Sequence, residues 1–475
     1  MTPPPFADDG PEFIDMFAGC GGFSLGLREA GWRLVRAINH WAPAIRSHQI
    51  NFINSEHERA DLNTYDMRRL RRAKVLVGSP ICTEASPSGA NSGYRRAQQI
   101  EGQAGLFEEE PVEQAGYERT RATFWDFVRA AETWRFAAVL MENVPDVAWK
   151  WGLFESFLRV MMVLGYNLQI VCVSAAHVGG AGNLHAPQWR DRMFLSFTRE
   201  GVPLPDLAPR PGAWCRRCDR AVSAVQWWNP RTRRFLGHYV GKYGVQYEYR
   251  CPAGHGRVEP YVCPAASIIE WDKPGRRLGD GRMPVAETQR RIREGLALLR
   301  EPALITVNHG EGADHRALPV LSSPLPTRTT KIGEGIAMPP GYSPPASIPA
   351  FIAEMRTHQG SRHVSEPVTT VATSGRHHYL GIVDDCGQIE VDERALVVPY
   401  RRTGKPGPLG GQEGEPVAIE DVRWRMLTLL EHRRTQRLPD WYELVGTLDE
   451  QRMQVGNAVP VNVAHWLGTQ VAQVL

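Results

Sequence analysis

The stretch that most constrains the fold of this chain is residues 75–89, which read VLVGSPICTEASPSG. Its first three residues are apolar and mostly β-branched, and this pattern predicts a short buried strand. The glycines and prolines that follow exclude a helix and predict a shaped loop. Cys82 lies just past the strand end, where open α/β sheets hold their chemistry. Its thiol is therefore a candidate nucleophile, and the alternative is a small buried apolar cysteine.

Length and composition limit the class of protein. The chain has 475 residues, 42% hydrophobic and 23% charged, which predicts two or three globular domains. No apolar run is long enough for a signal core or a bilayer span, and eight scattered cysteines do not resemble a disulfide framework. We therefore expect a cytoplasmic protein. The net charge of +3 is too small to indicate nucleic acid, and arginine clusters such as 68–72 and 231–234 fit either a solvated face or a binding surface.

The first 61 residues predict a ligand site at the ends of two strands. Residues 13–27, FIDMFAGCGGFSLGL, read as strand, glycine turn and helix, and the glycines allow a ligand to approach the backbone closely. Their spacing is not the GxGxxG of dinucleotide-binding proteins. A second strand, 34–38, ends at His40 and Trp41, where a ribose would lie. Asp61 is able to accept a hydrogen bond from an exocyclic amine.

Further polar residues follow later strands. The strand predicted at 137–141 ends at Glu142, whose carboxyl group would face the same crevice as Cys82. A surface glutamate at a turn is the alternative. The motifs QWRDR and QVGNAVP precede a strand at 193–197 and a helix at 461–471. Together these segments predict an α/β sheet with its polar residues at one edge.

This ordered set of motifs resembles the DNA (cytosine-5)-methyltransferases. The matching stretches are FIDMFAGCGGFSLGL, GSPICTEAS, MENVP, QWRDR, DVRWRMLTLLEHRRTQRLPDWY and VGNAVP, within roughly the first 200 and the last 55 residues. The resemblance implies a doubly wound, Rossmann-like α/β sheet with an inserted β-rich target-recognition domain. The chain departs from the family in three places: Ile81 separates Pro80 from Cys82, Thr83 replaces the usual glutamine, and Asn39-His40-Trp41 replaces the usual ribose-binding acid.

The resemblance also implies an activity. A methyl group would pass from S-adenosylmethionine to carbon 5 of a cytosine flipped out of double-stranded DNA, through a covalent cysteine adduct. Cys82 would be the nucleophile, and Glu142 would hold a proton at the ring nitrogen, for which it needs a raised pKa. Arg190 and Arg192 would fix the base oxygen and orient Glu142, with Arg192 the more important. The long polar segment after Cys82 would close as a lid.

The implied cofactor is S-adenosylmethionine. Phe17 or Phe23 would contact its adenine or methionine end. His40 or a neighbour would make one ribose contact in place of two, with Trp41 packed against the sugar or adenine. An alternative cofactor remains open because of the changed strand end. The full set of expected cofactor-binding residues is Asp15, Phe17, Gly19, Gly21, Gly22, Phe23, His40, Trp41, Asp61, Pro80, Asn457 and Ala458.

The middle of the chain carries a candidate metal site. Cys215 and Cys218 form a Cys-x2-Cys pair, and Cys251 with His255 supplies a second pair, as in a zinc ribbon. Cys263 competes with His255 for the fourth place. Four protein ligands leave no open coordination position, so we expect a structural zinc ion.

Four segments are predicted. Residues 1–200 would form the first part of the catalytic domain, 201–300 a recognition region with the zinc site, 301–420 a β-rich repeat region, and 421–475 the rest of the catalytic domain. The repeat unit reads strand, polar loop, proline turn and strand, with a degraded third copy.

Two other functions compete with this interpretation. A tRNA cytosine-5 methyltransferase would need little recognition domain, which the large insert argues against. A catalytically inactive DNA-binding regulator would not need Cys82, Glu142, Arg190 and Arg192 together. We expect a monomer that binds double-stranded DNA in a bacterial or phage-infected cell. The target sequence and the existence of a companion restriction enzyme remain open.

Overall fold

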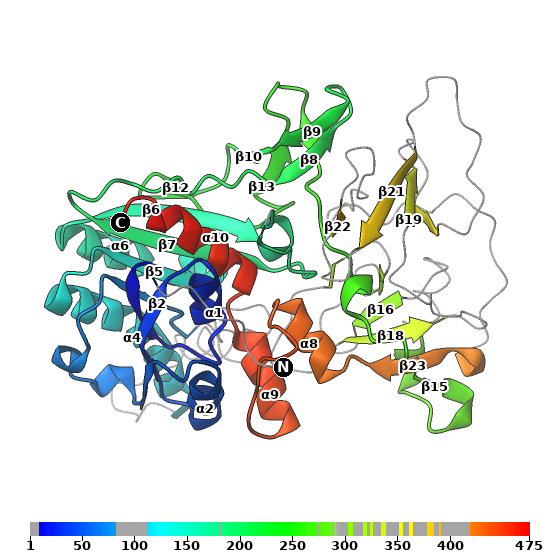
Figure 1. Cartoon of the computed structure of the whole chain (residues 1–475), viewed down its shortest axis with the longest axis horizontal. Helices are drawn as coiled ribbons and strands as arrows, with labels where there is room; N and C mark the ends of the chain where they lie inside the picture. The colour runs from blue at the N-terminus through cyan, green and yellow to red at the C-terminus, as the bar shows by residue number, and fades with distance from the viewer. Residues whose placement is uncertain are drawn as a thin grey trace, which may run out of the picture.

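The computed structural model describes most of the chain outside the loop after Cys82 and the repeat region (Figure 1). The described residues are 9–81, 112–180, 182–273, 275–286, 288–290, 292, 303–306, 317–320, 324–325, 334–338, 351–354, 361–363, 378–383, 389–390 and 419–475. Cys82 and Thr83 lie outside them, as does the third copy of the repeat.

A seven-stranded sheet with the order β3-β2-β1-β4-β5-β7-β6 forms the centre of the larger domain. Its strands are β1 (Glu12–Met16), β2 (Arg33–Asn39), β3 (Glu56–Arg59), β4 (Val75–Gly78), β5 (Ala138–Asn143), β6 (Tyr166–Ser174) and β7 (Asp191–Arg199). Only β7 runs antiparallel to its neighbours in this sheet. The order reverses between β1 and β4, so the expected doubly wound α/β sheet is confirmed.

Helices cover both faces of this sheet. The helices of the described residues are α1 (Gly22–Glu29), α2 (Ala42–Asn51), α4 (Val112–Trp134), α5 (Asp146–Lys150), α6 (Phe154–Val163), α8 (Leu429–Thr435), α9 (Leu448–Asn457) and α10 (Val461–Ala472). Strand residues alternate between two cores: Val75 and Val77 share one with α1 and α10, while Leu76 shares the other with α4 and α6. Because both faces are buried, these strands read as continuous apolar runs in the sequence.

The end of the chain returns to its beginning. Helix α10 lies along α1 (Figure 1), and a Cβ atom at Gly26 would lie 2.4 Å from the carbonyl oxygen of Val461. The indole of Trp32 donates a hydrogen bond of 3.2 Å to the carbonyl of Gly468. A side chain larger than hydrogen at position 26 would therefore push the two helices apart.

The insert between the two parts of this domain is made of small β-sheets. Its strands are β8 (Gly212–Cys215), β9 (Arg220–Ser223), β10 (Val225–Trp228), β11 (Arg234–Phe235), β12 (His238–Tyr239), β13 (Tyr247–Arg250), β14 (Arg257–Val258), β15 (Arg276–Arg277), β16 (Ala303–Thr306), β17 (Ala317–Pro319), β18 (Glu334–Met338), β19 (Phe351–Glu354), β20 (Ser361–His363), β21 (His378–Val383), β22 (Ile389–Glu390) and β23 (Arg423–Met426). The first two copies of the repeat contribute β16 and β19. One sheet has the order β15-β23-β18-β16-β17 and so runs across the divisions predicted near residues 300 and 420.

Within the described residues, no helix combines the length and the apolar character that a membrane crossing requires.

Candidate functional site

The carboxyl ends of four neighbouring parallel strands, β2, β1, β4 and β5, meet at one edge of the central sheet. The helix after β1 packs on one face and α4, which precedes β5, packs on the other. An open α/β sheet forms its ligand crevice at such a reversal point. Among the described residues, the predicted catalytic and cofactor-binding residues of the first 200 lie near these strand ends, just after β3, or at or just before the start of the neighbouring β7.

The turn after β1 presents a backbone cradle. Phe17 and Gly19 have φ angles of 59° and 56°, in the left-handed region. A Cβ atom at Gly19 would have no described heavy atom within 4 Å, so this turn faces open space. Phe17 is half-buried and stacks on Phe127 of α4, with ring centroids 5.9 Å apart. These features fit a ligand that packs against the turn.

The other two glycines of this turn, Gly21 and Gly22, are needed for a different reason, which is close packing. A Cβ atom at Gly21 would lie 2.5 Å from the hydroxyl of Tyr442, and one at Gly22 would lie 2.3 Å from the carbonyl oxygen of Val459. Both are therefore required by the returning C-terminal segment. Phe23 is also used inside the protein, because its ring is 2% exposed and lies edge-on to Phe194. Of the two phenylalanines, only Phe17 lies beside the cradle.

The ends of β2 and β3 carry the residues predicted for the ribose and adenine. Asn39 accepts a hydrogen bond of 2.8 Å from the backbone N–H of Trp41 and so shapes the turn into α2. His40 is exposed, Trp41 is half-buried, and Arg59 donates to the carbonyl of His40. Asp61 is exposed and accepts hydrogen bonds from the backbone and side-chain nitrogens of Asn63. Asn39 is buried, whereas His40, Trp41 and Asp61 are not and so remain accessible to a ligand.

The residues before Cys82 are held from two sides. The side-chain amide of Asn143, at the end of β5, donates a hydrogen bond of 2.9 Å to the carbonyl of Pro80. The backbone N–H of Ile81 donates to the hydroxyl of Thr123 on α4 at 3.2 Å. The backbone leading to Cys82 therefore has a defined place at the crevice. The motif MENVP contains Asn143, but the sequence does not indicate its partner.

Glu142 and Arg192 form a buried ion pair. The Nε atom of Arg192 lies 2.6 Å from Oε1 of Glu142, and both side chains are less than a tenth exposed. Glu142 is paired with Phe194 in the β5–β7 ladder. Arg192 lies two residues before Phe194 on β7, so the two side chains point to the same face of the sheet. The contact does not have hydrogen-bond geometry at Oε1, which leaves the carboxylate able to bind a further donor.

Arg190 has different neighbours. Its guanidinium group donates hydrogen bonds of 3.0 and 2.9 Å to the carbonyls of Gly456 and Ala458, and the residue is 2% exposed. Asn457 lies exposed between these two carbonyls, while Ala458 is buried. Arg190 therefore fastens the C-terminal segment to the sheet, and Arg192 is the arginine in contact with Glu142.

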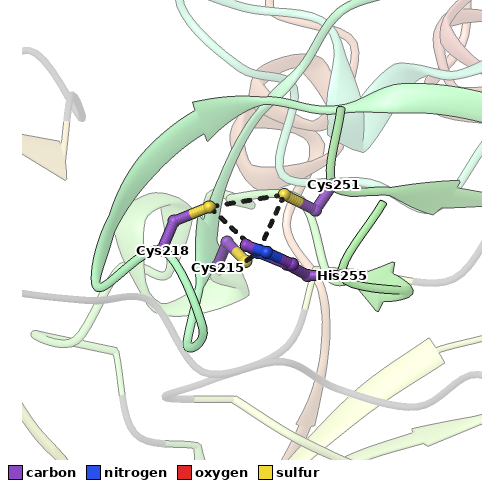
Figure 2. Close-up of side chains that lie close together, drawn as sticks. All are labelled: Cys215, Cys218, Cys251 and His255. Carbon is purple, nitrogen blue, oxygen red and sulfur yellow. Dashed lines mark hydrogen bonds between the residues drawn. The ribbon is translucent and has the colours of Figure 1, made fainter. Parts of the chain in front are cut away.

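Four side chains of the insert come together as a metal-ligand set (Figure 2). The Sγ and Nδ1 or Nε2 atoms of Cys215, Cys218, Cys251 and His255 lie within 4.8 Å of one another. Cys215 ends β8, and Cys251 directly follows β13. The thiol of Cys263, in contrast, contacts the hydroxyl of Ser267 at 3.1 Å.

The spacing within this set fits a tetrahedral ion. Zinc bonds of about 2.3 Å to sulfur and 2.0–2.1 Å to nitrogen place sulfur atoms about 3.8 Å apart and sulfur about 3.6 Å from nitrogen. The observed separations are 3.6 Å for Cys218 and Cys251, and 3.5, 3.1 and 3.8 Å from His255 to the three sulfur atoms. Three thiols and one imidazole are also a donor set typical of structural zinc.

Sequence comparisons find relatives of this chain among the type II methyltransferases. Type II methyltransferase M.HgiDI of Herpetosiphon aurantiacus is 30% identical over 199 residues, which are 41% of this chain and 54% of the relative. Type II methyltransferase M.HgiGI of the same organism is 41% identical over 89 residues, 18% of this chain and 70% of the relative. The chain thus spans about half the length of the first of these relatives.

Among solved structures, a Spodoptera frugiperda DNMT2 mutant superposes with a TM-score of 0.47 and 15% identity, covering 97% of this chain and 99% of that one. The model of one protein family, C-5 cytosine-specific DNA methylase, matches residues 12–208 and 346–473, which together are well over half of the chain. This protein belongs to the C-5 cytosine-specific DNA methylase family.

Proposed function

We propose that this protein transfers a methyl group from S-adenosylmethionine to carbon 5 of cytosine in double-stranded DNA. The observation that carries the proposal is the buried pair of Glu142 and Arg192 beside the anchored Pro80 backbone, in a chain of this family. The anchored backbone leads to Cys82, whose thiol would then share one crevice with the carboxyl group and the guanidinium group.

The cofactor fits the edge of the sheet next to this crevice. The turn at Gly19 faces open space among the described residues, and Oδ1 of the buried Asp15 has no hydrogen-bond partner there. Phe17, His40, Trp41 and Asp61 would hold the cofactor, which supplies an electrophilic methyl group when bound. Asn457 and Ala458 would complete the site from the C-terminal segment.

Each catalytic residue has one task in the reaction. The thiolate of Cys82 adds to carbon 6 of cytosine, which makes carbon 5 electron-rich. Glu142, once it has taken up a proton from solvent, would bind the ring nitrogen N3 and offer it this proton as the addition occurs. Arg192 holds Glu142 and binds the base oxygen. After methylation, which would leave S-adenosylhomocysteine, transfer of the carbon 5 proton to water, return of the N3 proton to Glu142 and departure of the thiolate from carbon 6 would restore the aromatic ring and the free enzyme.

The base must leave the duplex before the thiol reaches it, at a cost of roughly a few kcal/mol. The zinc ion bound by Cys215, Cys218, Cys251 and His255 would stiffen the part of the insert that lies on the DNA. Trp227 and Arg250 belong to this region: the guanidinium carbon of Arg250 lies 3.5 Å from the ring centroid of Trp227, which is 38% exposed. Such aromatic and basic pairs suit contact with a nucleic acid.

Incubation with labelled S-adenosylmethionine and unmethylated duplex DNA tests the activity. We expect label in DNA, modified cytosines in a defined sequence context, and a covalent complex with duplexes that contain 5-fluorocytosine. Cys82→Ser should abolish both transfer and trapping while retaining cofactor binding. Cys386→Ser, a control in the region between the catalytic segments, should retain them. Trapping by Cys82→Ser, or label in tRNA but not in DNA, would contradict the proposal.

A further inference from the structure

A continuous chain of hydrogen bonds leads from the cofactor edge to the protein surface. Oδ2 of Asp15 lies 2.6 Å from the hydroxyl of Ser24, and this hydroxyl lies 3.1 Å from Nε2 of His48. Nδ1 of His48 lies 2.8 Å from Nε2 of His57, whose Nδ1 lies 3.0 Å from the carbonyl of Ser55. Asp15, Ser24 and His48 are fully buried, whereas His57 is half-buried.

The central sheet positions Asp15 and His57, the two ends of this chain of hydrogen bonds. Asp15 on β1 is paired with Ala37 on β2, and Ala37 is paired with His57 on β3, so the three residues form one row on one face. Strands lie about 4.8 Å apart, which separates the ends by about 10 Å. The small side chain of Ala37 leaves room above the row, and Ser24 from α1 and His48 from α2 bridge it.

The hydrogen bonds limit where the protons can lie. The carbonyl of Ser55 only accepts, so Nδ1 of His57 carries a proton, and a neutral His57 accepts at Nε2 from His48. A neutral His48 then accepts at Nε2 from the hydroxyl of Ser24. In the neutral arrangement a protonated Asp15 donates to the oxygen of Ser24, whereas an ionised Asp15 accepts from the hydroxyl of Ser24 at Oδ2. With every group neutral, each hydrogen bond is satisfied.

A second arrangement satisfies the same bonds. Asp15 gives its proton to Ser24, Ser24 gives its own proton to Nε2 of His48, and the Nδ1 proton of His48 moves to Nε2 of His57. Three transfers leave a carboxylate at Asp15 and an imidazolium at His57, with no change in total charge. An ionised Asp15 with both histidines neutral would instead set a lone pair of His57 against the carbonyl of Ser55.

Burial favours the neutral arrangement in the absence of a ligand. It raises the pKa of Asp15 to about 7, against the opposing effect of hydrogen bonds from Ser24. It also lowers the pKa of His57, and lowers that of His48 well below its usual value. A cation placed beside Asp15 would reverse this preference, because it stabilises the carboxylate.

The other titratable groups around the row do not compete for the proton. Burial raises the pKa of Cys20 to about 12 and that of Tyr442 well above its usual range, so both stay neutral. On the opposite face of β3, Glu56 and Glu58 are paired with Arg36. Among the described residues, Asp15 and His57 are thus the two ends between which a proton can move near neutral pH.

We propose that Asp15, Ser24, His48 and His57 form a proton relay that turns Asp15 into an anion when the positively charged cofactor binds, with His57 keeping the proton. The relay rests on the proposed function, because S-adenosylmethionine supplies the cation. The unpartnered Oδ1 of Asp15 is the atom that would face this charge. Ser24, His48 and His57 are positioning residues in this scheme, since they act only through Asp15.

Two measurements on the full-length protein test the relay. Calorimetry of S-adenosylmethionine binding in buffers of different ionisation enthalpy counts the protons exchanged with solvent. We expect close to none for the wild type at pH 6, where Asp15 is mostly protonated before binding, because the proton stays on His57. Nitrogen-15 NMR of labelled histidines should show the His57 signal, identified by its absence from His57→Asn, moving from neutral imidazole to imidazolium on binding.

In His57→Asn, the proton that leaves Asp15 has no acceptor within the protein. The variant should release protons on binding, and its affinity should fall about tenfold between pH 8 and pH 6, as expected for a group with a pKa of about 7 that must ionise. His238→Asn removes another half-buried histidine, on β12, and should behave as the wild type.

The outcomes separate the relay from the proposed function. A wild type that binds the cofactor while His57 stays neutral would overturn the relay and leave the methyltransferase proposal intact. Equal proton release by the wild type and His57→Asn would do the same. A wild type that does not bind S-adenosylmethionine at all would overturn the proposed function and the relay with it.

Discussion

The side-chain amide of Asn143 donates a hydrogen bond to the carbonyl oxygen of Pro80, two residues before Cys82. This bond ties the end of β5, which carries Glu142, to the loop that carries the predicted nucleophile. Asn143, which takes no part in the proposed chemistry, would therefore help to set the distance between the acid and the thiol.

Asn143→Ala should leave the Pro80 carbonyl without its partner and loosen this loop. Small misplacements of reacting groups cost up to about 100-fold in rate, so we expect kcat for methyl transfer to fall 10- to 100-fold with KM for the cofactor changed little. Gln169→Ala is the matched control. Gln169 lies on β6, away from the crevice, and its side-chain amide donates the same kind of hydrogen bond to the carbonyl of Pro205. Equal rates for both variants would contradict a positioning role for Asn143.

Glu142→Gln should abolish most activity, because an amide cannot offer a proton to the ring nitrogen. General acid catalysis contributes typically 10²- to 10⁴-fold, and we expect a loss of this size in single-turnover methylation. The buried Arg192 also loses its counter-charge, so the free energy of unfolding should fall by about 3 kcal/mol or more. Glu155→Gln, which removes an exposed pair with Arg233, should change unfolding by less than about 1 kcal/mol.

The metal site predicts the zinc content of the protein and an effect of the metal on DNA binding. Protein purified without chelators should contain one zinc ion per chain, and His255→Ala should lose it. We expect removal of the metal to weaken DNA binding and to leave S-adenosylmethionine binding unchanged, since the cluster lies in the insert. Cys263→Ser is the control that should keep the metal. A wild type without zinc, measured by metal analysis, would refute the site.

The buried carboxyl group of Asp15 predicts a dependence of stability on pH. Its pKa is raised to about 7 in the folded protein, from about 3.9 in the unfolded chain, so between these values the folded state holds more protons. The stability contributed by this group is complete below pH 4 and is lost as the pH rises to 7.

Asp15→Asn is isosteric with the protonated acid and should remove this dependence. The variant should therefore gain stability over the wild type between pH 4 and pH 7, by at most about 4 kcal/mol at the upper end. Urea unfolding at a series of pH values measures the difference. A constant difference across this range would show that Asp15 is already ionised at pH 4.

His40→Glu should strengthen cofactor binding. A carboxylate accepts hydrogen bonds from both ribose hydroxyls, whereas a neutral imidazole accepts one, and the extra bond is worth on the order of 1 kcal/mol, or several-fold in affinity. His40→Gln, which is similar in length but uncharged, should not reproduce the gain. Weaker binding by His40→Glu in calorimetry would mean that this strand end is adapted to histidine.

The sequence by itself determined the order of strands and turns, the Cys-x2-Cys pair and the family. These features are local: alternating burial, glycines at left-handed turns and ligands a few residues apart leave their pattern along the chain. Both faces of the sheet are covered, which is why Val75-Leu76-Val77 could be predicted as a buried strand from three letters.

Tertiary structure decided which partner each of these residues meets. It assigned Gly21 and Gly22 to the packing of Tyr442 and Val459, set Phe23 in the core, and separated Arg190 from Arg192 by their neighbours. It also placed His255, and not Cys263, among the three cysteines. Many of these contacts join residues more than 250 positions apart, and the relay from Asp15 to His57 crosses three strands and two helices. Sequence patterns report spacing along the chain, whereas such partners are set by which surfaces come together when the two ends of the chain pack against one another.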